Sequence, residues 1–110
     1  MTNVFKGGLV RPDVTTRILG PWVELELRPT HLEFRMRFRW LARFFGPWQL
    51  ERSVIRDVYP GSLNALDPWG RVNFLAEEIM PWAFLTQWPL DVLEAAEKLG
   101  YPVRYDDQIR

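Results

Sequence analysis

The sequence predicts a mainly β domain that ends in a single helix, an α+β class. Alternating apolar and charged residues over 22–40 indicate a long β-hairpin, and short β-like segments continue to residue 87. One amphipathic segment follows over residues 89–99. At 110 residues the chain suits one domain. Strands followed by one helix would form a small barrel or bent sheet plugged by that helix.

The first 13 residues are expected to form a flexible arm. Two glycines and a proline interrupt this stretch, which predicts no more than a short strand at residues 4–5. Residues 14–19 then predict a first short strand. Gly20 and Pro21 are expected to stop it.

The hairpin is the clearest local prediction. Period-2 alternation over this length is typical of half-buried antiparallel strands. For both apolar faces to point inward, Leu27 must lie opposite Leu32, so the loop has an even number of residues. Proline cannot adopt the positive φ of a two-residue type I′ turn, so Pro29 favours a four-residue loop over 28–31. The inward residues of the second strand are then Leu32, Phe34, Met36, Phe38 and Trp40.

This register has consequences for the charged face. It places Glu24 opposite Arg35 as an ion pair. It also places Trp22 beside Arg37, where a cation–π contact is possible. Glu26 falls opposite Glu33, which is an unfavourable pair unless another charge intervenes.

The segments after the hairpin are shorter. Residues 41–45 break the alternation and end at Gly46-Pro47, a turn signal. Further strands are expected at residues 48–50, 55–59, 71–76 and 82–87, with a bend or bulge at 51–53 and a loop at 60–70.

The C-terminal helix has recognisable ends. Pro89 suits its first turn, and Asp91 lies where the helix dipole favours negative charge. Gly100 is expected to end the helix, after which residues 101–103 pack back on the sheet and residues 106–110 form a polar tail. The predicted buried stripe is Val92, Leu93, Ala96 and Leu99.

The element order, the phrase Trp82-Ala83-Phe84-Leu85-Thr86-Gln87-Trp88-Pro89 and the ending Leu99-Gly100-Tyr101-Pro102-Val103 resemble small bacterial pleckstrin-homology-like (PH-like) proteins of uncharacterised function. The resemblance covers residues 14–105 and depends more on element order than on motifs. It implies a strongly bent barrel of about seven antiparallel strands, capped by the helix. PH-like domains bind lipids, peptides or proteins, so the resemblance implies no single function.

Two departures from the family limit this resemblance. The eukaryotic domains usually carry a Trp within the C-terminal helix, whereas Trp88 precedes it here. Their phosphoinositide-binding members carry several basic residues around the first hairpin loop. Here that loop, residues 28–31, contains one Arg and no Lys, so phosphoinositide binding of that kind is not supported.

Composition restricts the function classes further. The chain has no Cys, which excludes disulfides and Cys-ligated metal sites, and its first residues do not resemble a signal peptide, so we expect a cytoplasmic protein. Net charge is zero, yet residues 1–56 hold ten basic and five acidic residues, and residues 57–110 hold four and nine. Folding could mix the two halves and cancel this asymmetry, or leave a basic and an acidic face that favour self-association or a polar partner.

The segment around the predicted turn at Gly46-Pro47 is the first candidate for a contact surface. Its aromatic and basic residues are typical of protein interfaces, including homodimers. Packing as core is an equally favoured interpretation, and insertion into a membrane interface is a less favoured one, because zero net charge gives no general attraction to anionic surfaces. The candidate residues are Trp40, Leu41, Arg43, Phe44, Phe45 and Trp48.

Arg35, Arg37 and Arg39 are secondary candidates, because alternation places them on one face of a strand. They could bind phosphate, lipid headgroups or nucleic acid, but a solvated outer face is favoured, because half-buried strands normally carry their charges on the outer side. Nucleic-acid binding is not expected, because the neighbouring aromatic residues point to the opposite face. His31 is the only histidine, so neither a metal site nor a cofactor is expected.

These observations favour a non-enzymatic PH-like interaction module that binds itself or another protein. The alternative is peripheral binding to an anionic membrane lipid or a phosphorylated ligand through the arginines and the aromatic segment.

Overall fold

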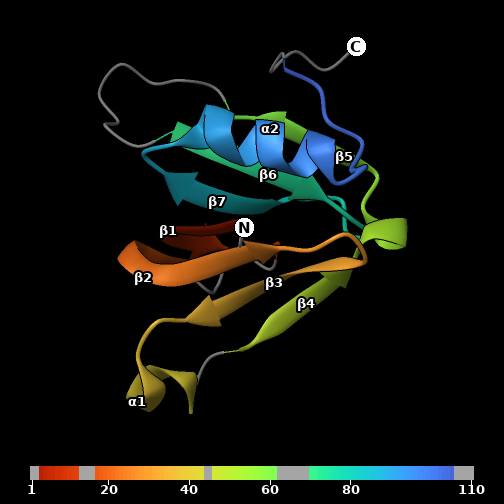
Figure 1. Cartoon of the computed structure of the whole chain (residues 1–110). Coiled ribbons are helices and arrows are strands. Elements are labelled where there is room, and N and C mark those ends of the chain that lie inside the picture. The colour runs from red at the N-terminus through yellow and green to blue at the C-terminus, as the bar shows by residue number, and fades with distance from the viewer. Residues whose placement is uncertain (1–2, 13–16, 44–45, 62–69, 106–110) are drawn as a thin grey trace.

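The computed structural model describes residues 3–12, 17–43, 46–61 and 70–105. It consists of a seven-stranded sheet, a short helix and one longer C-terminal helix (Figure 1). The elements are β1 (Asn3–Val10), β2 (Arg17–Leu27), β3 (His31–Met36), α1 (Arg39–Ala42), β4 (Trp48–Glu51), the 3-10 turn η1 (Arg52–Val54), β5 (Asp57–Pro60), β6 (Gly70–Leu75), β7 (Trp82–Thr86) and α2 (Pro89–Lys98).

The strand order is β4-β3-β2-β1-β7-β6-β5, and every neighbouring pair is antiparallel. The predicted class, a mainly β fold with one C-terminal helix, is confirmed, and the arrangement is consistent with a PH-like fold. The sheet is curled but does not close into a barrel. Within the described ranges no ladder joins the outer strands β4 and β5, which η1 connects in the chain.

Strand β1 corrects the expected N-terminal arm. Residues 3–7 pair with β2 and residues 8–10 pair with β7, so β1 lies in the middle of the sheet. Gly7 is required there, because a Cβ atom at this position would overlap the carbonyl oxygen of Leu85 in β7. Gly7, one of the two glycines that suggested a loose segment, therefore allows two backbones to approach closely.

Strand β2 is also longer than predicted. It continues through Gly20 and Pro21, which were expected to end a separate short strand. The β1–β2 register shifts at this point: between the pairs Leu9↔Ile18 and Gly7↔Val23, β1 has one residue and β2 has four. Such an irregularity bends a strand. It allows β2 to follow the curl of the sheet. Residues 14–16 lie outside the described part of the chain.

The hairpin register is confirmed. Leu27 pairs with Leu32, and the backbone N–H of Arg28 donates to the carbonyl of His31 at 2.9 Å, which closes the four-residue loop. Strand β3 nevertheless ends at Met36, so Phe38 and Trp40 do not continue its buried face.

The later strands and the bend lie within a few residues of their predicted positions, and η1 forms the bend. Of the expected loop over residues 60–70, Pro60 belongs to β5 and Gly70 to β6, while residues 62–69 fall outside the described ranges. The predicted polar tail, residues 106–110, falls outside them as well.

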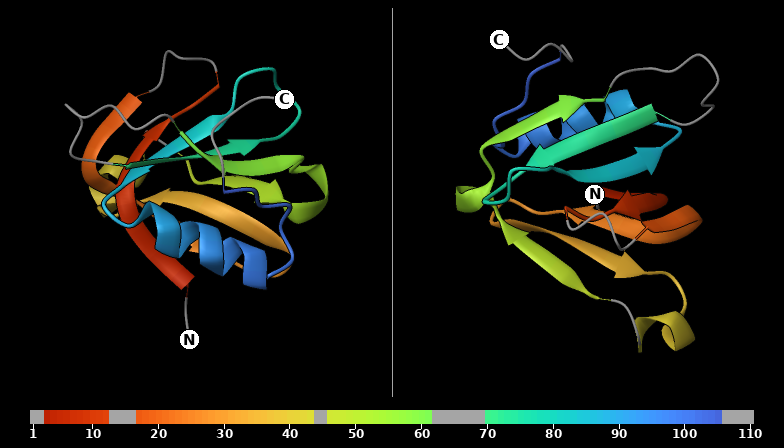
Figure 2. Two further views of the ribbon diagram at one scale, coloured as in Figure 1. Left: turned by 90° about the horizontal axis from the view of Figure 1, so that it is seen from above. Right: turned by 180° about the vertical axis from the view of Figure 1, so that it is seen from behind.

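Helix α2 packs on β5 and β6 and contributes to a core shared by the whole sheet (Figure 2). Val92, Leu93 and Ala96 are fully buried as predicted, whereas Leu99 is only partly buried. Gly100 ends the helix with a φ of 91°, a value that glycine adopts readily.

The segment after α2 packs back on the sheet, as predicted. Tyr101 is buried, and its hydroxyl donates to the carbonyl oxygen of Arg28 at 2.7 Å. Val103 forms a parallel bridge with Val58 of β5.

The two halves of the sequence occupy separate halves of the sheet. Strands β1 to β4 form one side, and β5 to β7 with α2 form the other (Figure 1). The possibility that folding mixes the basic and acidic halves is therefore wrong at the level of strand order.

Candidate interaction site

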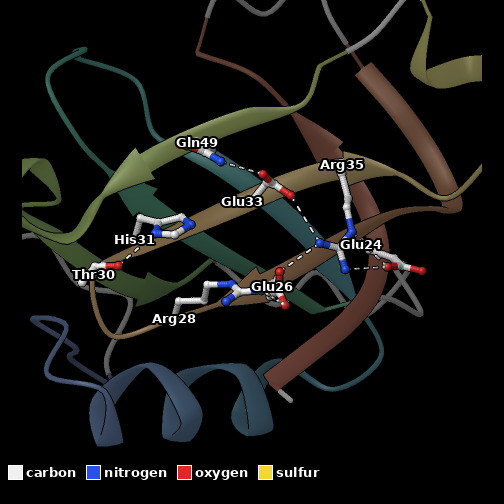
Figure 3. A network of polar contacts seen from close by, with 8 residues as sticks. All are labelled: Glu24, Glu26, Arg28, Thr30, His31, Glu33, Arg35 and Gln49. Atoms are coloured by element: carbon white, nitrogen blue, oxygen red, sulfur yellow. Dashed lines mark hydrogen bonds and ion pairs between the residues drawn. The ribbon is translucent and has the colours of Figure 1, made fainter.

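A charged network covers the outer face of the β2–β3 hairpin (Figure 3). Alternation along both strands directs the charged side chains to this face. The guanidinium of Arg35 lies at the centre of the network, because three carboxylates contact it. The Nη1 atom lies 2.9 Å from Glu26 Oε1 and 3.3 Å from Glu33 Oε1. The Nη2 atom lies 3.2 Å from Glu24 Oε2, which confirms the predicted pair and adds two further carboxylates.

The network explains how Glu26 can lie opposite Glu33. Arg35 bridges the two carboxylates, Arg28 Nη2 lies 3.0 Å from Glu26 Oε2, and Gln49 donates to Glu33 at 2.8 Å. Burial by itself would raise the pKa of Glu26, but the hydrogen bonds and charges of Arg35 and Arg28 outweigh it and hold this pKa below its ordinary value. The carboxylate is therefore ionised at neutral pH although the residue is only 8% exposed.

The arginines that are secondary candidates for anion binding do not lie in one row on the strand. Three carboxylates surround Arg35. Arg37 donates to the carbonyl of Pro21 at 2.8 Å, and its Nε atom lies 3.9 Å from Glu24 Oε1. Arg39 belongs to α1 rather than to the strand. Because three carboxylates already contact its guanidinium, Arg35 has little capacity left to bind an anionic ligand.

Exposed aromatic residues gather where β3 passes into α1. Trp22, Phe38 and Trp40 are 43%, 36% and 65% exposed. The rings of Trp22 and Phe38 are in contact, with centroids 5.3 Å apart. Arg39 and Arg43 are exposed on the same short helical segment, and Arg37 Cζ lies 5.8 Å from the Phe38 ring. We call this surface the aromatic–basic end; it comprises Trp22, Arg37, Phe38, Arg39, Trp40 and Arg43.

The predicted segment contributes only part of this surface. Trp40 and Arg43 belong to it. Leu41 lies in α1, but its side chain is outside the description, as are Phe44 and Phe45 altogether. Trp48 instead follows the core interpretation: it is half-buried against the core, with its ring 6.4 Å from that of Trp82.

Sequence reasoning missed Trp22 and Phe38, because alternation assigned Phe38 to the inner face. The signal that could have found them is Pro21. In the observed register Pro21 would lie opposite Phe38, and proline has no N–H to continue the ladder. In the described ranges, the last backbone hydrogen bond of the hairpin runs from the Arg37 N–H to the Trp22 carbonyl, at 2.9 Å.

A hollow of about 420 Å³ lies beside the hairpin loop and is the other candidate site. Within it, Thr30 Oγ1 lies 3.0 Å from His31 Nδ1. In the part of the chain described, no carboxylate bonds the other ring nitrogen, so the pair lacks the orienting group of a catalytic triad. Its lining residues are Thr30, His31, Gln49, Glu51, Arg52 and Ser53.

In the described ranges, no group of three or more metal-ligating side chains lies together. No helix in these ranges combines the length and the apolar character needed to cross a bilayer. Comparisons of the chain with protein-family models, with curated proteins and with solved structures found no match.

Proposed function

We propose that this protein is a non-enzymatic PH-like interaction module that associates with protein, in the first place with itself, through the aromatic–basic end. The observation that carries the proposal is the joint exposure of Trp22, Phe38 and Trp40. The core can bury large rings completely, as Phe34 and Phe84 demonstrate. Trp and Arg are enriched among the residues that dominate binding energy at protein interfaces.

The energetics favour a moderate, concentration-dependent association. Burying one large apolar side chain contributes about 1.5–3 kcal/mol. Association costs about 4–15 kcal/mol in lost freedom of motion. Burying three half-exposed rings can therefore offset an association cost at the lower end of this range. Any remaining cost must be offset by interactions of the flanking arginines.

The test is light scattering behind size exclusion, at two protein and two salt concentrations. We expect the apparent mass of the wild-type protein to rise with concentration. Trp40→Ser should keep the circular dichroism spectrum and remain monomeric, because Trp40 is 65% exposed and adds little to the core. Ile79→Ser is the matched control, since Ile79 is 94% exposed in the β6–β7 loop, outside the aromatic–basic end.

Two results would contradict the proposal: a wild-type protein that is monomeric under every condition, or a Trp40→Ser variant that associates like the wild type. A Trp40→Ser variant that unfolds would instead make the ring part of the core.

Anionic lipid is the second candidate ligand. It is favoured because every charged residue in the segment 37–43, which carries two of the exposed rings, is an arginine. Salt-sensitive cosedimentation with phosphatidylserine vesicles, lost in Arg39→Gln/Arg43→Gln, would support it. No binding to these vesicles at low salt would reject it.

A further inference from the structure

The two halves of the sequence carry opposite net charges and supply different strands of the sheet. Residues 1–56 carry a net charge of +5 and residues 57–110 carry −5. The first half supplies β1 to β4, and the second supplies β5 to β7 and α2. In Figure 1 and in the view from behind in Figure 2, α1 projects at one end of the molecule and α2 covers the other.

Helix α2 also exposes apolar side chains. Trp88, immediately before the helix, is 49% exposed, and Leu90 in its first turn is 63% exposed. Asp91 and Glu94 are exposed on the same side of the helix, because residues three or four positions apart lie on one face. The opposite face is the buried stripe. We call this surface the acidic helix face; it comprises Trp88, Leu90, Asp91, Glu94 and Glu97.

The two surfaces complement each other in chemistry. Each has large exposed apolar groups, and the nearby charges are opposite in net sign: Arg37, Arg39 and Arg43 at one, and Asp91, Glu94 and Glu97 with the single Lys98 at the other. Two aromatic–basic ends facing each other would bring six arginines together. Like charges across an interface cost several kcal/mol, whereas opposite charges select the partner and speed encounter.

We propose that the aromatic–basic end of one copy binds the acidic helix face of a second copy. This inference depends on the proposed function and names the partner surface that the function leaves open. Because the two surfaces differ, the contact is head-to-tail, and it generates a ring or an open filament rather than a closed two-fold dimer.

The decisive experiment mixes two variants, each with one surface disabled. The first, Arg39→Glu/Trp40→Ser, retains only its acidic helix face. The second, Leu90→Ser/Glu94→Arg, retains only its aromatic–basic end. All four positions are exposed, and unchanged circular dichroism spectra will establish that both variants fold.

Each variant alone should be monomeric by light scattering, with association weakened at least tenfold. An equimolar mixture should form a dimer of one copy each and nothing larger, because only one complementary pair of surfaces remains. As a control, Glu77→Arg changes an exposed charge of the acidic half outside α2 and should leave assembly intact.

The outcomes separate this inference from the proposed function. If the helix variant associates like the wild type while the first variant does not, the contact is end-to-end between two aromatic–basic ends, and only the present inference fails. If the first variant also associates, the proposed function fails with it. If Glu77→Arg abolishes assembly as completely as Leu90→Ser/Glu94→Arg, net charge rather than docking drives it, and the inference is wrong.

Discussion

Arg35 shows how one side chain makes a crowded set of charges stable. Its guanidinium reaches Glu24, Glu26 and Glu33, and its side chain is 36% exposed. An exposed ion pair contributes about 0–1 kcal/mol, but removing one member of a partly buried network leaves the other charges uncompensated. Arg35 therefore stabilises the fold mainly by offsetting the repulsion among the carboxylates and the cost of burying their charges.

We predict that Arg35→Gln lowers the free energy of unfolding by about 1–3 kcal/mol at neutral pH. The pKa of Glu26 is lowered in the folded protein, so its stabilisation is present above the ordinary value of 4.5 and is lost as pH falls. The difference between the variant and the wild type should therefore shrink toward about pH 3. Urea unfolding followed by Trp fluorescence at both pH values measures it.

The control for this prediction is Arg43→Gln. No ion pair or hydrogen bond joins Arg43 to another residue in the described ranges. Its substitution should change stability by less than about 0.5 kcal/mol. An Arg35→Gln variant with the same small effect at neutral pH would contradict the role given to the network.

At the scale of elements, the C-terminal end of α2 is attached to two distant turns. Arg52 of η1 donates from Nη1 to the carbonyl of Leu99 at 2.9 Å. The Tyr101 hydroxyl bonds to the Arg28 carbonyl in the hairpin loop. These contacts hold the helix against the curled sheet at the end where β4 passes into β5.

Tyr101→Phe tests this attachment. Burial raises the pKa of Tyr101 to about 12, while the charge of Arg52 acts to lower it. Below the ordinary value of 10 the hydroxyl is protonated in both states, and its hydrogen bond should make the wild type more stable by about 1 kcal/mol. As pH rises from 10 to about 12, the unfolded chain ionises first, so this advantage is lost.

The measurement is urea unfolding of wild type and Tyr101→Phe at about pH 8 and about pH 11. The other tyrosines are common to both proteins, so only the difference between the two curves matters. A difference that stays constant with pH would show that Tyr101 is not buried as described.

At the scale of the whole molecule, β1 joins the two halves, since it pairs with β2 on one side and β7 on the other. Gly7→Ala would place a methyl group against the Leu85 carbonyl at this junction. We expect the free energy of unfolding to fall by about 1–3 kcal/mol or more, as for other overpacked sites. Because both halves share β1 and one core, unfolding should remain a single transition.

Coincident unfolding curves from circular dichroism and Trp fluorescence will check this. Lys6→Ala, at the exposed neighbouring position, is the control and should have little effect. Two separated transitions in the wild type would show that the halves fold independently.

Local patterns predicted the hairpin register and the buried face of α2, because period-2 and helical spacing report directly which side chains face the core. They failed at β1, where Gly7 resembles a loop residue until a second backbone lies against it. They also failed at Phe38, which continues the alternation although Pro21 on the partner strand has already ended the ladder. At the candidate site, Trp40 and Arg43 were predicted and Trp22 was not.

The fold class, the pairing of Leu27 with Leu32 and the position of the C-terminal helix could be predicted from local patterns, since these patterns reflect residues close together in the chain. Three properties became visible only in the folded molecule: which rings stay exposed at the aromatic–basic end, how Arg35 gathers three carboxylates, and the separation of the two sequence halves in the sheet. Those properties depend on contacts between segments far apart in the chain, which no local pattern encodes.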